Sequence, residues 1–109
     1  MTTPSLSDLV VSVDNEFPLE SSGIELTAEQ VLKLKRFSQA GSDTIGVLTA
    51  GLAAVGELMA ISEKDEMTHQ SLIGIGWLVH ELADLTCRLH DECIAANHKL
   101  QHMKVKVSQ

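Results

Sequence analysis

The C-terminal third of the chain carries an apolar repeat with alternating steps of three and four residues. Steps of three and four place side chains on one face of an α-helix, and no Pro interrupts the run. The repeat therefore predicts one long helix over about residues 65–104. Eleven positions follow it: Leu72, Ile75, Val79, Leu82, Thr86, Leu89, Cys93, Ala96, Leu100, Met103 and Val107.

Two shorter helices are expected before the long one. Thr27 and Gln30 have the spacing of a capping box, which predicts a helix over residues 28–39 that stops at Gly41. Residues 44–61 are apolar on nearly every side, with Glu57 as the one charged residue, and such a helix is usually buried. The short segment between residues 61 and 65 predicts that this helix and the long one form an antiparallel hairpin.

The composition favours an all-α fold. Aromatic residues make up 3% of the 109 residues and apolar residues 44%, so the core is expected to consist of aliphatic side chains. The length leaves room for one domain. We therefore predict a helical hairpin with one very long C-terminal helix and a short N-terminal helix, dimerising into a four-helix bundle.

Charge is distributed unevenly along the chain. Residues 1–30 contain six acidic residues and no basic one, whereas residues 97–109 contain Lys99, Lys104 and Lys106 and no acidic one. Residues 1–26 are predicted to form a flexible acidic arm ahead of a helical domain at 27–109. Either both ends are simply solvated, or the arm docks on a basic surface of its own tail or of a partner.

Helix lengths indicate where a partner is needed. At about 1.5 Å per residue, the helix over 44–61 is roughly 27 Å long and the C-terminal helix roughly 60 Å. The second half of the long apolar face then lacks a neighbour within the chain. A second apolar stripe of the 44–61 helix lacks one too: Val47, Ala54, Leu58 and Ile61.

Soluble monomers avoid apolar patches of this size, so we predict a homodimer. Its expected interface consists of six residues of the long helix: Leu82, Leu89, Cys93, Ala96, Leu100 and Met103.

The polar side of the long helix carries four weak candidates for metal ligands: His80, Asp84, His98 and His102. Pairs spaced i,i+4 on a helix chelate metal ions well. One helix supplies two or three ligands at most, however, and a solvated polar face accounts for the same stripe. We therefore predict no metal site and no cofactor.

No catalytic signature stands out. Cys87 can be interpreted as a redox thiol or as an ordinary, partly exposed cysteine. The nucleotide-binding, nucleophile-elbow, zinc-protease and paired-cysteine motifs are absent from the sequence. We expect no catalytic residues and no enzymatic activity. Two Cys without a basic, apolar leader indicate the reducing cytoplasm.

These features favour a small protein–protein interaction module: an adaptor, inhibitor or accessory protein of bacterial or phage type. It would act as a homodimeric helical bundle on an unidentified protein partner. A net charge of −7 argues against nucleic acid as the partner.

Two alternatives remain. The first is a membrane-associated, holin-like protein that uses residues 44–61 as a span, against which Glu57 and the short apolar stretch at 71–79 argue. The second is a metal- or redox-binding helical bundle.

Overall fold

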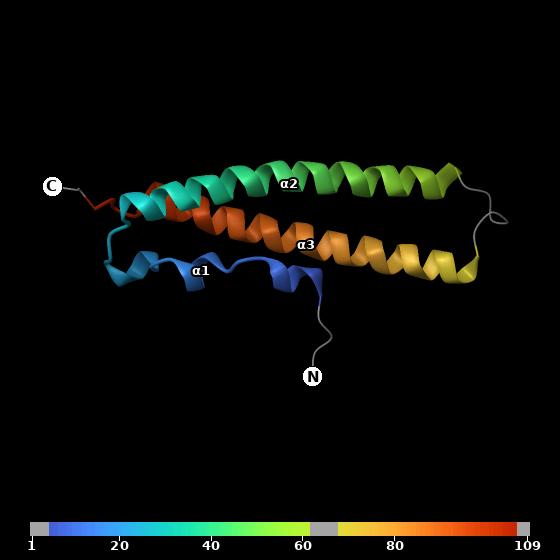
Figure 1. Ribbon diagram of the computed structural model, residues 1–109, viewed down its shortest axis with the longest axis horizontal. Coiled ribbons are helices and arrows are strands. Elements are labelled where there is room, and N and C mark those ends of the chain that lie inside the picture. The colour runs from blue at the N-terminus through green and yellow to red at the C-terminus, as the bar shows by residue number, and fades with distance from the viewer. Residues whose placement is uncertain (1–4, 62–67, 107–109) are drawn as a thin grey trace, which may run out of the picture.

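Two long antiparallel helices make up most of the molecule. The computed structural model describes residues 5–61 and 68–106. Helices α2 (Ala28–Ile61) and α3 (His69–His102) each contain 34 residues and lie side by side over their full length (Figure 1). The result is a rod of 68 × 32 × 17 Å. The all-α prediction is confirmed, and the described residues add one isolated β-bridge, between Leu26 and Val105.

The N-terminal arm lies along α3, on the side away from α2 (Figure 1). It contains the 3-10 helix η1 (Leu6–Leu9), the one-turn helix α1 (Val13–Glu16) and the 3-10 helix η2 (Glu20–Ser22). The arm follows α3 from its middle to its C-terminal end, where the β-bridge fixes Leu26. We call residues 5–26 the strap. Of the two interpretations of the acidic arm, docking on the chain's own tail is the one observed.

Helix α2 begins as the sequence predicts. The Thr27 amide donates to Oε1 of Gln30 at 2.9 Å, and the Gln30 amide donates to Oγ1 of Thr27 at 3.1 Å. This reciprocal pair is a capping box, which satisfies backbone donors that the first helical turn leaves unpaired.

The predicted stop at Gly41 is wrong, since residues 28–39 and 44–61 belong to one continuous helix. Gly41 is buried against α3, and a Cβ at this position would overlap Sγ of Cys93. The residue is therefore a point of close helix approach rather than a helix end. Three residues further on, Oγ1 of Thr44 donates to the Ala40 carbonyl at 2.7 Å, a bond that helical backbone geometry permits.

Helix α3 begins at His69 instead of residue 65, because Thr68 is its N-cap. The Thr68 hydroxyl accepts from the Ser71 amide at 3.1 Å. Residues 62–67, where the earlier start was expected, lie outside the described residues. The helix ends at His102, two residues before the predicted end.

The core lies at one end of the rod, where strap, α2 and α3 meet. Its fully buried members are Val13, Leu26, Leu34 and Ala96. At the other end, called the loop end here (residues 44–61 of α2 and 69–80 of α3), none of the described residues is buried. Two helices alone cannot enclose a core, which accounts for the lack of buried residues among those described at this end.

Candidate interaction surfaces

Helix α2 has two apolar faces at the loop end, and they have different surroundings. Ile45, Leu48, Leu52 and Val55 are half-buried, as expected for residues that face α3. The second face consists of Val47, Ala54, Leu58 and Ile61, and we call it the outer stripe. Val47 is 72% exposed and Ile61 is 73% exposed. This helix was predicted to be buried, and that prediction is wrong for its outer stripe.

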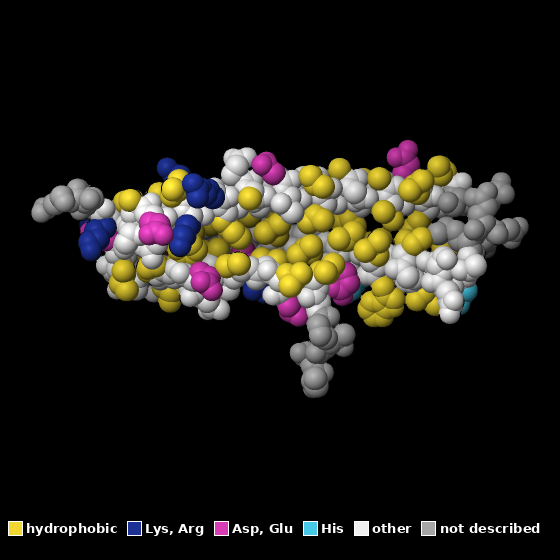
Figure 2. Space-filling view, in the orientation of Figure 1, with side chains coloured by type: hydrophobic (Ala, Val, Ile, Leu, Met, Phe, Trp, Pro, Cys, Tyr) yellow, Lys and Arg dark blue, Asp and Glu magenta, His cyan; other side chains and the backbone are white. Residues whose placement is uncertain are grey.

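The exposed apolar surface continues onto α3 at the loop end. Ile73, Trp77 and Leu78 are exposed, Trp77 to 64%. The hydrogen bond from the Leu6 amide at the start of the strap is to Oε2 of Glu81, at 2.9 Å, on the C-terminal side of these three residues. Figure 2 shows hydrophobic side chains over both helices at this end, with few charged side chains between them.

The glycines at the loop end have open space beside them. A Cβ added at Gly46, Gly51, Gly56, Gly74 or Gly76 would meet no atom within 4 Å. A glycine inside a helix costs about 1 kcal/mol relative to alanine. At Gly41 close packing against Cys93 offsets that cost, whereas none of the described residues packs in this way against the glycines of the loop end.

The strap is held on α3 by a buried lysine. The Lys99 side chain is fully buried, with 0% of its surface exposed. Its Nζ donates to the Pro18 carbonyl at 2.9 Å and to Oε1 of Glu20 at 2.6 Å, and it pairs with Oδ1 of Asp14 at 3.0 Å. An ammonium group has three donors, so these three strap oxygens satisfy it completely. We call this arrangement the Lys99 latch.

Two glutamates of α3 hold the rest of the strap. Glu81 accepts from the Leu6 amide, and Oε1 of Glu92 accepts from the Val13 amide at 2.6 Å. Arg88 holds Glu92 in place through a 3.3 Å contact from Nε to Oε2. Residues 81, 92 and 99 are spaced 11 and 7 apart, which places them on one face of a helix. The strap therefore follows a single polar line along α3.

The charges of the latch support one another. The hydrogen bond from Lys99 holds the pKa of Glu20 below its ordinary value. Burial by itself would lower the pKa of Lys99, but the hydrogen bonds to Glu20 and Asp14 outweigh burial and raise it. Both groups thus remain charged over the physiological range, which keeps the strap attached.

The six residues predicted as an oligomer interface are already in contact with the chain itself. Cys93 and Ala96 are buried, and Leu82, Leu89, Leu100 and Met103 are half-buried. The expectation depended on a helix over residues 44–61, which is too short to cover these six residues. Because α2 starts at Ala28, its first half covers this seam of α3 together with the strap. The structure therefore gives no reason to place an interface at these six residues. The uncovered apolar surface lies at the loop end instead.

The metal candidates are separated along α3. The His98 and His102 rings lie 4.4 Å apart, and Nδ1 of His98 is 3.6 Å from Oε2 of Glu20. His80 instead meets the edge of Trp77 at 6.1 Å between ring centroids, and Asp84 is exposed. Within residues 5–61 and 68–106, no three His, Cys, Asp or Glu side chains converge as metal ligands would.

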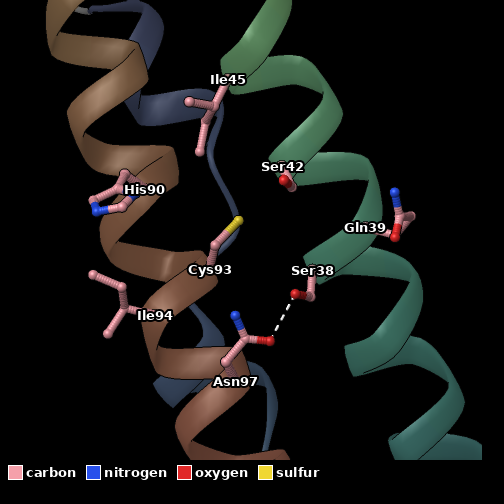
Figure 3. A pocket seen from close by; sticks show the side chains of 8 residues that line it. All are labelled: Ser38, Gln39, Ser42, Ile45, His90, Cys93, Ile94 and Asn97. Atoms are coloured by element: carbon pink, nitrogen blue, oxygen red, sulfur yellow. Dashed lines mark hydrogen bonds between the residues drawn. The ribbon is translucent and has the colours of Figure 1, made fainter.

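A shallow groove between α2 and α3 contains the buried Cys93. In Figure 3 the thiol points across the groove toward Ser42, and Oγ of Ser38 donates to Oδ1 of Asn97 at 2.7 Å. Burial raises the pKa of the Cys93 thiol, so it stays protonated and is a poor nucleophile. Cys87, the redox candidate, is exposed and lies outside this groove.

Comparisons with known proteins add nothing to this geometry. A scan against protein-family models finds no match, and searches of curated proteins and of solved structures find no similar chain.

The sequence did not identify Lys99 as the residue that holds the arm. The acidic arm and the three lysines of the tail were a usable signal. Which lysine is buried depends on the path of the strap, which no local pattern encodes.

Proposed function

We propose that this protein is a small, non-enzymatic protein–protein interaction module that works as a homodimeric helical bundle. The observation that carries the proposal is the exposed outer stripe of α2, on the half of the hairpin that lacks a third layer. Two hairpins that pair through this stripe form a four-helix bundle, in which each supplies the layer that the other lacks.

The outer stripe and the other exposed apolar residues of the loop end together approach the area that a stable dimer needs. At roughly 150 Å² per fully exposed residue, Val47, Leu58 and Ile61 of the outer stripe expose on the order of 300 Å², and all the large apolar residues of the loop end together expose on the order of 700 Å². A standard interface buries about 800 Å² per partner. These residues are Val47, Leu58, Met59, Ile61, Leu72, Ile73, Trp77 and Leu78.

Low local charge also supports self-association at this place. The chain carries −7 overall, but residues 44–61 contain Glu57 as their one charged residue. Two copies can therefore bring these segments together without burying a series of like charges, which would oppose association elsewhere on this acidic surface.

The outer side of the strap is the better candidate for a different protein. Leu9 is 79% exposed, and Val11, Leu19 and Ile24 are exposed as well. Acidic residues lie among them, so a partner with apolar and basic side chains fits this surface. The module would then dimerise through the loop end and bind its target through the strap, as an adaptor or inhibitor does.

The dimer is tested with two matched glutamate substitutions on α2. Val47→Glu places a charge in the outer stripe, while Leu32→Glu places one on an exposed apolar position outside it. A buried charge costs several kcal/mol, so the Kd for dimerisation should rise at least 100-fold for Val47→Glu and less than 3-fold for Leu32→Glu. Sedimentation velocity over a concentration series measures both. Equal Kd values for the two variants would contradict the proposal.

The target-binding part is tested by affinity capture from the native host, followed by mass spectrometry. The tagged parent and the Leu9→Asp variant serve as paired baits, since Leu9 touches little of its own chain. We expect a protein with a basic, apolar surface to be retained by the parent and lost with the variant. Identical recoveries with both baits would show that the strap does not bind the target.

Membrane association is a second candidate, favoured by one observation. Helix α2 contains an 18-residue window with a mean hydropathy of 1.8, and none of that window is buried. Glu57 and the acidic residues Glu63, Asp65 and Glu66 would have to enter or cross the bilayer, which is costly. Fractionation of native cells decides: recovery in the soluble fraction without detergent supports the dimer, and recovery in the membrane pellet supports the span.

A further inference from the structure

The strap and α2 together border a small apolar hollow. The two elements flank α3 (Figure 1), and side chains from both line a space of about 330 Å³. Ligand pockets in proteins measure roughly 300–1,000 Å³, so this space suits one bulky side chain better than a whole cofactor. Its lining residues are Val11, Glu16 and Phe17 of the strap and Gln30, Lys33 and Phe37 of α2.

The aromatic walls of the hollow are held in place by the core. Phe17 and Phe37 are the two Phe residues of the sequence, and both are half-buried and pack against the buried cluster around Val13 and Leu34. The Phe17 amide also donates to the Val13 carbonyl at 3.0 Å, which fixes the end of α1. Because the core supports both rings, a partner would meet walls that are already formed, which lowers the entropic cost of binding.

The charges beside the hollow favour a basic occupant. The strap, residues 5–26, holds five acidic residues and no basic one. At the rim formed by α2, Lys33 is already paired with Glu29 at 3.5 Å. Glu16 is exposed, and no basic side chain in the part of the chain that the structure describes forms an ion pair with it. Its carboxylate is therefore free to pair with a cation of another protein.

We infer that this hollow anchors the target protein: a basic segment of the target inserts one bulky apolar side chain between Phe17 and Phe37 and places a Lys or Arg beside Glu16. The inference rests on the proposed function and deepens it, since Val11 belongs both to the hollow and to the exposed outer side of the strap. A few bulky side chains in well-packed pockets carry most of the binding energy of an interface, and Trp and Arg are prominent among them.

Blocked tripeptides test this inference on the full chain. The probes are acetylated and amidated Lys-Trp-Lys, Gln-Trp-Gln and Lys-Ala-Lys, which differ in charge or in the central side chain. Nuclear magnetic resonance titrations follow the methyl signals of Val11 at the hollow and of Val47 in the outer stripe. One inserted side chain binds weakly, so we expect Lys-Trp-Lys to shift the Val11 signals with a Kd of roughly 1 mM, and Lys-Ala-Lys to give no saturable shift.

Two glutamine substitutions separate the charge at the hollow from the overall charge of −7. Glu16→Gln and Glu25→Gln each remove one exposed carboxylate of the strap, but Glu25 lines a different cavity, next to His102. Glu16→Gln should raise the Kd of Lys-Trp-Lys about 3-fold and Glu25→Gln less than about 1.5-fold, which is the range of an exposed ion pair. Neither substitution should change the Kd of the uncharged Gln-Trp-Gln.

The outcomes distinguish this inference from the proposed function. Equal Kd values of Lys-Trp-Lys for the two variants overturn the pairing with Glu16. Shifts at Val47 without shifts at Val11, or no saturable shift up to about 10 mM, overturn the hollow as the anchor. None of these results contradicts the proposed function, which fails instead through a monomeric mass or through identical recoveries with the parent and Leu9→Asp baits.

Discussion

Replacing Lys99 by methionine tests whether the latch holds the strap. Methionine keeps most of the length and apolar volume of the lysine stem, so the substitution removes chiefly the ammonium group. That group makes one hydrogen bond to the Pro18 carbonyl and ionic contacts to Glu20 and Asp14. The variant therefore isolates the polar part of the latch.

The magnitude follows from the exposure of the partners. A hydrogen bond to a charged group contributes about 1.5–3 kcal/mol to the free energy of unfolding, and breaking a buried ion pair lowers it by about 3–5 kcal/mol. Here both carboxylates are partly exposed, and they can turn to water once the ammonium is gone. We therefore expect Lys99→Met to lower the free energy of unfolding by about 2 kcal/mol, near the lower end of these ranges.

Urea denaturation followed by circular dichroism measures the effect, with parent and variant at one protein concentration. With a slope of about 1–2 kcal/mol per molar urea, the midpoint should fall by roughly 1–2 M. Lys104→Met is the matched control, because Lys104 is exposed, and it should change stability by less than about 0.5 kcal/mol. A Lys99→Met midpoint equal to that of the control would refute the latch as a source of stability.

Two further predictions concern the helix contact and the pH range of the strap. Gly41→Ala should lower the free energy of unfolding by about 1–2 kcal/mol, because the added Cβ overlaps Sγ of Cys93. Cys93→Ala in the same chain should reverse that effect, which a double-mutant cycle measured by urea denaturation tests. Gly46→Ala is the control: it has open space around it and should raise the free energy of unfolding by up to about 1 kcal/mol. Since the pKa of Glu20 is depressed below 4.5, the latch should weaken as the pH falls below that value. Since the pKa of Lys99 is raised above 10.5, the latch should also weaken when the pH rises above that value. Nuclear magnetic resonance signals from strap methyl groups that stay unchanged down to pH 3 would contradict the predicted loss at low pH.

Local signals in the sequence were sufficient for the start of α2 but not for its continuity. The Thr27–Gln30 box was predictable because both partners lie within one turn. Gly41 was not, because a glycine serves equally as a helix stop and as a point of close approach. The choice depends on Cys93, which is 52 residues away in the sequence.

The predicted helix stop at Gly41 is also the reason why the interface was predicted on α3. With α2 divided at Gly41, the seam around Leu89 and Leu100 lacked a neighbour, whereas the continuous helix covers it. The outer stripe of α2 was recognised from helical periodicity, which does not depend on where the helix starts. The position of Lys99 could not be predicted, since its burial requires the strap to lie along α3 and bring Pro18 and Glu20 over it.

The mass of the full chain in solution tests the central claim most directly. The account predicts that light scattering at micromolar concentration gives twice the chain mass of 11.8 kDa, without detergent or a second protein. A mass of one chain across the micromolar range would show that the loop end is stable with its apolar faces in water, and would contradict the account.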